Sequence, residues 1–256
     1  MAKPRSYKTE GIILRQMPLG ESDRLLTLYT PGYGKIRTVA RRVRRTKSKL
    51  VGHTEPLTHS RLSISHGKTL DWISEAETIH SFRRIKEDLA LLTKALYLSE
   101  LVDGFSVELE PNRPVYKLLF DTITIFNNTI EPLSYSTLIR QFELRLLMLS
   151  GFGPDLHNCV ECREELEPAN HFYSCNRGGV LCKKCQNVSE DRLIPLSLNS
   201  MKVLRFLERQ SSDAAAKLDV PEDIMREIEK LLVTNVTYVL EREIKSASFM
   251  KLVTSS

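Results

Sequence analysis

The chain has 256 residues, of which 41% are hydrophobic and 27% are charged. This length and composition suit a globular protein with a sizeable core. No apolar run is long enough to cross a membrane, and the N-terminal stretch lacks the hydrophobic segment typical of export. We therefore expect a cytoplasmic protein with no membrane partner, in a compartment where paired cysteines indicate a metal site more often than a disulfide.

The net charge of +5 is unevenly distributed. Residues 1–82 contain 15 Lys and Arg against 7 Asp and Glu, whereas residues 83–256 contain 22 against 25. The basic character therefore belongs to the first third of the chain, which favours an anionic partner there.

Residues 1–82 have the pattern of short strands. Apolar residues alternate with polar neighbours in four places: Ile12 with Leu14, Leu26 with Leu28, Leu62 with Ile64, and Leu70 with Trp72. Glycine and proline turn signals separate these runs. About five strands at this spacing predict a small barrel or sandwich, with an OB-like barrel among the candidates.

After Phe82 the apolar spacing becomes that of helices. The pattern predicts five of them, over residues 85–102, 114–126, 138–149, 200–209 and 221–239. Residues 210–216 are predicted to be a flexible connector. The chain thus divides into residues 1–82, a β-domain, and residues 83–256, an α-helical domain with a cysteine-bearing segment at about residues 154–192.

Four of the five cysteines form two matched pairs with nineteen residues between them: Cys159 with Cys162, and Cys182 with Cys185. A two-residue gap lets both thiolates of a tight turn face one ion, and two such turns complete a tetrahedron with zinc–sulfur distances of about 2.3 Å. Four protein ligands leave no position for water or substrate, so the spacing predicts one structural zinc ion. A redox dithiol or four unrelated buried thiols fit the doubled spacing less well.

Other thiol and imidazole groups are weaker candidates. Cys175 or His171 would be a ligand only by displacing a member of a matched pair, so we interpret them as a thiol outside the site and a surface histidine. His53, His59 and His66 have no matched carboxylate in the sequence, and we expect surface or loop positions for them.

A dense run of cations lies between residues 35 and 49. Its members, with no acidic residue among them, are the candidate nucleic-acid-binding residues: Lys35, Arg37, Arg41, Arg42, Arg44, Arg45, Lys47 and Lys49. Repulsion between like charges favours an anionic partner, and the flat fork of arginine matches phosphate oxygens. Tyr29 and Tyr33 are near enough in sequence to stack on bases. The alternative is a solvated connection between strands, but the density of one sign favours binding.

The sequence contains no motif of an enzyme. Phosphate-cradling glycine loops, the G-x-S-x-G elbow and the H-E-x-x-H zinc motif are all missing. We therefore expect no catalytic residues.

Three stretches resemble the RecO family of bacterial recombination mediators. The first is GIILRQMPLGESDRLLTLYTPGYGKIRTVARRVRRTKSKL, the second is LIRQFELRLLMLSGFGPDLHNCVEC followed by GGVLCKKC, and the third, TYVLEREIKSASFM, resembles the last helix of the family. They occur in the family's order over nearly the whole chain. The chain departs from the family pattern where Arg42 and Arg163 replace a common glycine and Thr46 replaces a common proline.

The resemblance implies an α+β protein: an N-terminal five-stranded OB-fold β-barrel, followed by an α-helical domain with an inserted four-cysteine zinc finger. The basic segment of residues 41–49 matches the family's basic loop, and the paired cysteines match its finger. The implied role is non-enzymatic and nucleoid-associated: binding single- and double-stranded DNA, annealing strands in DNA repair and, with RecR, helping to load RecA. The DNA would be coated by single-strand-binding protein, whose acidic C-terminal tail RecO binds. The alternative is another nucleic-acid-binding regulatory factor with an OB-fold and a zinc ribbon.

Overall fold

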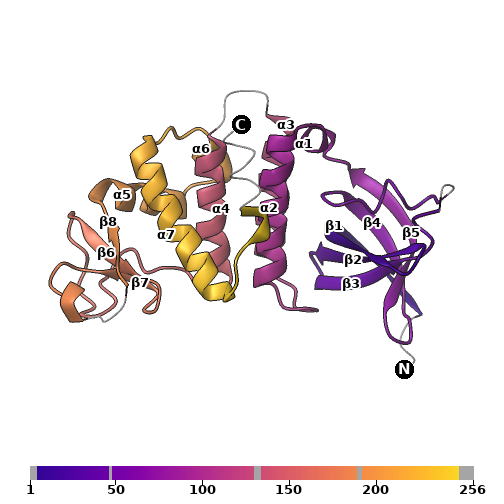
Figure 1. Ribbon diagram of the computed structural model, residues 1–256, viewed down its shortest axis with the longest axis horizontal. Coiled ribbons are helices and arrows are strands. Elements are labelled where there is room, and N and C mark those ends of the chain that lie inside the picture. Colours follow the sequence, from indigo (N-terminus) through magenta and orange to yellow (C-terminus); the bar gives the residue numbers. More distant parts are fainter. Residues whose placement is uncertain (1–4, 46–47, 130–133, 189–191, 248–256) are drawn as a thin grey trace. The chain divides into compact units, whose positions relative to one another are not determined.

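The structure is a computed structural model that describes residues 5–45, 48–129, 134–188 and 192–247. The chain forms two compact units (Figure 1). The barrel unit consists of Met1–Asn128 and Ile244–Ser256, and the helical unit consists of Thr129–Glu243. The sequence-based boundary at residue 82 follows the last strand of the barrel, and as a domain boundary it stays a prediction.

Five strands close the N-terminal barrel: β1 (Ser6–Leu19), β2 (Asp23–Thr30), β3 (Gly34–Ala40), β4 (His59–Ser65) and β5 (Asp71–His80). Their order is β1-β2-β3-β5-β4, and β1 pairs antiparallel with both β2 and β4. A short parallel pairing of β3 with β5, at Thr38 with Asp71 and Val39 with Trp72, completes the closure. The predicted five-stranded OB-fold barrel is thus confirmed.

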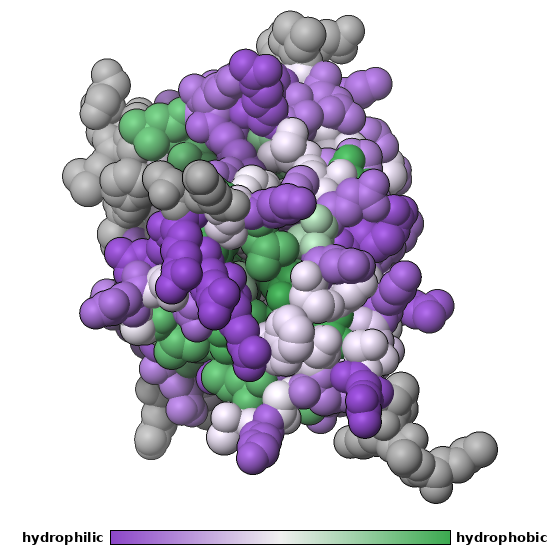
Figure 2. Space-filling model, turned by 90° about the vertical axis from the view of Figure 1, so that its right-hand side faces the viewer, coloured by the Kyte–Doolittle hydropathy of each residue, from purple (hydrophilic) through white to green (hydrophobic). Residues whose placement is uncertain are grey.

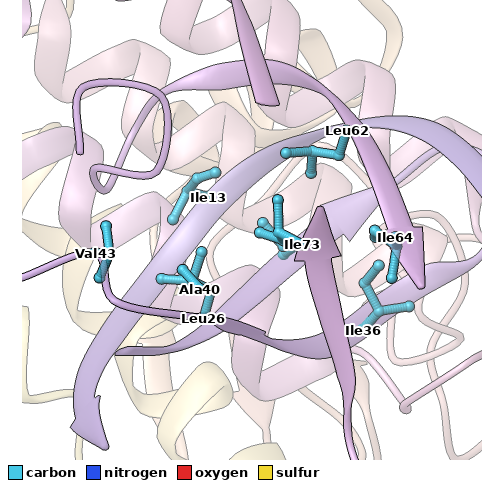
Figure 3. Close-up of a cluster of buried hydrophobic side chains, with 9 residues drawn as sticks. Ile13, Leu26, Ile36, Ala40, Val43, Leu62, Ile64 and Ile73 are labelled. Carbon is cyan, nitrogen blue, oxygen red and sulfur yellow. The ribbon is translucent and has the colours of Figure 1, made fainter. Parts of the chain in front are cut away.

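Alternating side chains of these strands fill the barrel interior (Figure 3). The cluster contains Ile13, Leu26, Leu28, Ile36, Ala40, Val43, Leu62, Ile64 and Ile73. The predicted inward positions on β2 and β4 are confirmed, whereas those assigned to β5 were wrong. Leu70 precedes the strand and is exposed, and Ile73 supplies the core residue. An irregularity in the β4–β5 register beside Ile64 accompanies this difference.

Three helices follow in the barrel unit: α1 (Arg83–Glu87), α2 (Leu89–Phe105) and α3 (Arg113–Asn128). The single helix predicted over residues 85–102 is therefore two helices. Asp88 is extended, and its carboxylate accepts a hydrogen bond from the Leu91 amide at 3.0 Å, which caps α2. Asn112 caps α3 in the same way, accepting from the Val115 amide at 3.2 Å.

The chain returns to the barrel unit at Ile244. There the carboxylate of Glu100, on α2, accepts hydrogen bonds from the amides of Lys245 and Ser246 at 3.1 and 2.9 Å. The Ser246 hydroxyl donates to the same carboxylate at 2.5 Å. The unit is therefore built from two separate stretches of chain.

The helical unit combines α-helices with a small sheet. Its described elements are α4 (Tyr135–Leu149), β6 (His171–Ser174), β7 (Gly179–Leu181), the 3-10 helix η1 (Gln186–Val188), β8 (Ile194–Leu196), α5 (Leu198–Arg209), α6 (Ser212–Ala216) and α7 (Glu222–Leu240). The antiparallel sheet has the order β7-β6-β8. Helix α4 packs against α5, α6 and α7.

Two features of this unit differ from the sequence-based expectation. The predicted connector at residues 210–216 contains α6, which Ser211 caps and which buries Ala215 and Ala216. The segment resembling a last helix is interrupted after α7, because Glu241 is left-handed with a φ of 51°. Within the described residues, no helix is both long and apolar enough to span a membrane.

Candidate metal centre and nucleic-acid interface

The two cysteine pairs lie on two tight turns. In the first turn, the Arg163 amide donates to the Cys159 carbonyl at 2.9 Å; in the second, the Cys185 amide donates to the Cys182 carbonyl at 3.0 Å. The turns face each other, since the Cys182 amide lies 3.3 Å from the Sγ of Cys159. Strand β7 ends at Leu181 and so delivers the second pair directly into this position.

The thiols are spaced as a metal ion requires. The Sγ atoms of Cys159, Cys162, Cys182 and Cys185 all lie within 4.8 Å of one another, and those of Cys162 and Cys182 are 3.9 Å apart. A tetrahedral ion with metal–sulfur bonds of about 2.3 Å sets the sulfurs about 3.8 Å apart. The four predicted ligands are therefore placed to hold one metal ion, with Cys159 and Cys185 buried and Cys162 exposed.

The two weaker candidates lie outside this cluster. Cys175 is half-buried and does not belong to the four-thiol group. The prediction of a surface position for His171 was wrong, because β6 buries it to 4% exposure. Its Nε2 donates to the Glu167 carbonyl at 2.7 Å.

The segment after β3 forms a loop that projects cations. Val43 is anchored in the barrel core, and the residues on either side of it, Arg42 and Arg44, are exposed. The Arg42 amide donates to the Asp23 carboxylate at 2.7 Å, and the Arg44 amide donates to the Ser22 carbonyl at 2.9 Å. The hydrogen bond from Arg42 lowers the pKa of Asp23. The loop backbone is thus fixed to the β1–β2 turn while its side chains face outward.

Five of the eight predicted cations belong to this exposed group: Arg41, Arg42, Arg44, Arg45 and Lys49. We call them the basic loop. The guanidinium of Arg41 lies 4.6 Å from the ring centroid of Trp72, a cation–π distance. Lys47 lies outside the described residues.

The other two predicted cations are on β3 and have acidic partners. Lys35 is only 12% exposed, and its Nζ donates to the Asp103 carbonyl at 2.6 Å and lies 3.3 Å from the Asp103 carboxylate. The Arg37 guanidinium is 3.5 Å from the Glu108 carboxylate. These two side chains are less available to an external phosphate than the basic loop.

The two tyrosines near this segment differ. Tyr29 is 1% exposed, so the prediction that it stacks on bases was wrong. Tyr33 is 41% exposed, and its stacking stays a prediction.

A buried histidine was missed by the sequence interpretation. His59 is 5% exposed, with its Nε2 3.0 Å from the Tyr116 hydroxyl and its ring centroid 5.5 Å from that of His80. Burial, followed by the charges of His80 and Arg61, lowers its pKa to about 4. The pattern of β4 carried no signal of this, because α3 supplies Tyr116.

The other two histidines considered in the sequence analysis have polar partners. His53 Nδ1 is 2.8 Å from the Thr78 hydroxyl. His66 is exposed as predicted, but the view that it lacks a carboxylate was wrong, since its Nδ1 lies 3.1 Å from Asp71.

Fold and site together define a class: an OB-fold barrel protein with an exposed basic loop, a helical unit and a four-cysteine metal centre. Two family descriptions match the chain, "Recombination protein O N terminal" over residues 1–82 and "Recombination protein O C terminal" over residues 86–248. The chain belongs to the RecO family of DNA repair proteins. The resemblance seen in the sequence is thereby confirmed.

Similar proteins extend over the same length. The protein named DNA repair protein RecO of Dehalococcoides mccartyi (strain CBDB1) is 38% identical over 96% of this chain and 95% of its own. Its namesake in Desulforamulus reducens is 34% identical over 95% and 93%. That of Clostridium perfringens is 33% identical over 95% and 96%.

Proposed function

We propose that this chain is a non-enzymatic recombination mediator that binds single- and double-stranded DNA and anneals complementary strands. With RecR, it helps to load RecA onto DNA coated by single-strand-binding protein, whose acidic C-terminal tail it binds. Its place of action is the cytoplasm, at the nucleoid. Family membership supports this role, and no step of it makes or breaks a covalent bond.

The observation that carries the proposal is the basic loop. Val43 fixes the loop to the barrel core, so the arginines of the loop are held together on one exposed cationic surface. Two DNA strands repel each other through their phosphates, and cations that contact both reduce that repulsion. Arg41, Arg42, Arg44, Arg45, Lys47 and Lys49 are the proposed phosphate contacts, and Lys35 and Arg37 contribute to the field of the same surface.

Salt dependence tests this contact. If about five cations contact single-strand phosphates, log affinity falls against log salt with a slope near −3.5. We expect the combined change Arg42→Ala, Arg44→Ala and Arg45→Ala to make the slope shallower by about 2. Fluorescence anisotropy with a labelled oligonucleotide measures this.

A matched control removes three exposed cations from the helical unit: Lys202→Ala, Arg209→Ala and Arg226→Ala. The net charge changes equally in both variants, so only a local contact makes them differ. Equal slopes for both variants and the wild-type protein would exclude the basic loop as the DNA contact.

The mediator role has its own test. Complementary strands coated with single-strand-binding protein should anneal rapidly when this protein is added. Deleting the acidic tail of the coating protein should slow annealing, while naked strands should anneal as before. Annealing that does not depend on the tail would count against a mediator.

We also propose that the ion held by the four cysteines is Zn²⁺ with a structural role. Four thiolates in tetrahedral spacing suit zinc, and all four positions come from the protein. Elemental analysis of purified protein should give one zinc per chain, and Cys182→Ser should lower that content. A different metal, or none, would refute the assignment.

A further inference from the structure

Three aromatic rings from separate segments meet on the barrel surface. Tyr7 lies on β1, Tyr33 in the turn between β2 and β3, and His66 directly after β4. The ring centroids of Tyr7 and Tyr33 are 4.8 Å apart, and those of Tyr7 and His66 are 5.2 Å apart. We call these three rings the aromatic platform.

Two rings of the platform are partly exposed to solvent, while the third packs against the barrel core. Tyr7 packs against the barrel core cluster, whereas Tyr33 is 41% exposed and the His66 side chain is 39% exposed. The rings of Tyr33 and His66 are therefore accessible to a ligand. Exposed aromatic faces on an OB-fold, beside the loop between strands 4 and 5, occupy the region where such folds bind oligonucleotides.

Hydrogen bonds hold the rings of Tyr7 and His66 in place. The Asp71 carboxylate accepts from the Tyr7 hydroxyl at 3.4 Å, from His66 Nδ1 at 3.1 Å and from the Gly67 amide at 3.2 Å. Burial, and then the charge of Asp71, raises the pKa of Tyr7 to about 12, so this hydroxyl stays a donor. The negative charge of Asp71 is thus engaged within the cluster.

Hydrogen bonds fix the backbone of Tyr33, an exposed residue of the platform. The Tyr33 amide donates to the Thr30 hydroxyl at 3.0 Å, and that hydroxyl donates to the Gly34 carbonyl at 3.1 Å. Thr30 is itself fully buried. Because this backbone is already fixed, stacking of a ligand on the ring costs little backbone conformational entropy.

Cationic residues adjoin the segments that carry the platform. The His66 amide donates to the Arg5 carbonyl at 3.1 Å, and both Arg5 and Lys68 are exposed. Next to Asp71 in the chain, Trp72 carries the guanidinium of Arg41 over its ring. The barrel side of the molecule shows apolar side chains exposed within a largely hydrophilic surface (Figure 2). Rings on segments adjoined by cationic residues match a ligand with flat apolar faces and anionic links.

We propose that the aromatic platform is a stacking site for the unpaired bases of single-stranded DNA. This inference rests on the proposed function and deepens it: the basic loop takes phosphates, and the platform takes bases. Unpaired bases offer free faces to an aromatic ring, whereas the bases of a duplex are already stacked on one another. The platform therefore gives the protein a preference for single strands that phosphate contacts alone do not provide.

Oligonucleotides without bases separate the two kinds of contact. The probes are a thymidine oligomer and an abasic oligomer of equal length, which carry the same phosphates. We expect the wild-type protein to bind the thymidine oligomer about tenfold more tightly, because only that oligomer offers bases that stack on the rings. In Tyr33→Ala this ratio should fall below about threefold, with duplex affinity unchanged.

Two further variants make the result specific. Tyr33→Phe keeps the ring and should keep the ratio. Tyr238→Ala removes a tyrosine of 49% exposure from α7 and should also keep it. Thermal melting of each variant shows whether the barrel is intact, and Tyr33→Ala should melt close to the wild-type temperature because the ring is exposed.

The possible failures are distinct. Equal wild-type affinity for the two oligomers would overturn the platform, and if the basic-loop variant still weakened both, the proposed phosphate contacts would stand. A ratio unchanged by Tyr33→Ala would also overturn it. A wild-type protein that binds neither oligomer nor duplex would overturn both proposals.

Discussion

Two arginines adopt a backbone conformation that favours glycine. Arg42 has a φ of 54° and Arg163 a φ of 64°. These are the two positions at which the resemblance described in the sequence analysis implied a glycine. A left-handed backbone costs a residue with a Cβ about 1–2 kcal/mol. Glycine avoids this strain, but its greater conformational freedom in the unfolded chain offsets part of the gain in stability. An arginine at these positions therefore adds backbone strain to the turn.

Relieving this strain gives a prediction for the cysteine turn. We expect Arg163→Gly to raise the free energy of unfolding by about 0.5–1 kcal/mol in metal-loaded protein. Arg163→Ala removes the same side chain but keeps the Cβ, so it should give no such gain. Urea unfolding followed by circular dichroism compares the two, and equal effects would show that the side chain, not the backbone, matters.

The sequence shows where charged residues cluster, but it does not show which of them have partners in the fold. The run of cations between residues 35 and 49 is visible in the sequence, and the structure exposes five of them. The sequence does not show that Lys35 is engaged by Asp103, which lies 68 residues later. Such tertiary partners determine which charges remain available to a ligand.

At the scale of elements, the contact between α3 and β4 buries a titratable side chain, that of His59. His59 is neutral in the folded protein because its pKa is lowered to about 4, whereas an unfolded chain takes up the proton near pH 6.5. The stabilisation is therefore complete above pH 6.5 and is lost as the pH falls from 6.5 towards 4. Glu10, at 3.8 Å from His59, and the nearby His80 and Arg61 share this environment.

We therefore expect His59→Gln to be less sensitive to acid than the wild-type protein. Between pH 7.5 and pH 5, the wild-type free energy of unfolding should fall by about 1 kcal/mol more than that of the variant, after allowance for solvent screening. Urea titrations at both pH values measure the difference. An identical loss in both proteins would place the acid-sensitive group elsewhere.

Element types followed from the sequence more reliably than element ends. Strand alternation predicted a small barrel or sandwich, and helical spacing predicted the main helices, since each depends on local periodicity. The choice of the OB-fold barrel came from the family resemblance. The break at Asp88 and the helix α6 depend on single capping residues, Asp88 and Ser211, whose effect on a continuous apolar pattern is hard to see. The inward position on β5 was missed because Leu70 lies before the strand and is exposed, and Ile73, the neighbour of Trp72, enters the core.

At the scale of the whole molecule, the metal centre and the basic loop belong to different compact units. The cysteine turns were predictable because four thiols at fixed spacing determine their own geometry. The division of the chain depends on which helices pack with the barrel, so the boundary at residue 82 stays a prediction.

This separation predicts how loss of metal affects the protein. Replacing Cys182 and Cys185 with serine should lower thermal stability markedly, because the ion stabilises a segment with few large apolar residues. DNA affinity per folded molecule should change less than about threefold. Calorimetry and anisotropy on the same preparation test this, and a large loss of affinity in folded protein would return the cysteines to the DNA-binding surface.

The two-part construction of the barrel unit has a consequence for synthesis on the ribosome. Glu100 acquires the amides of Lys245 and Ser246 only after the intervening residues, which include the helical unit, have been translated. The helical unit, which is one uninterrupted stretch, has all its residues before then. Domains generally fold as units in the order in which they are synthesised. Here synthesis of the barrel unit begins before the helical unit and ends after it, so the Glu100 carboxylate has no amide partners from Lys245 and Ser246 while the helical unit is translated.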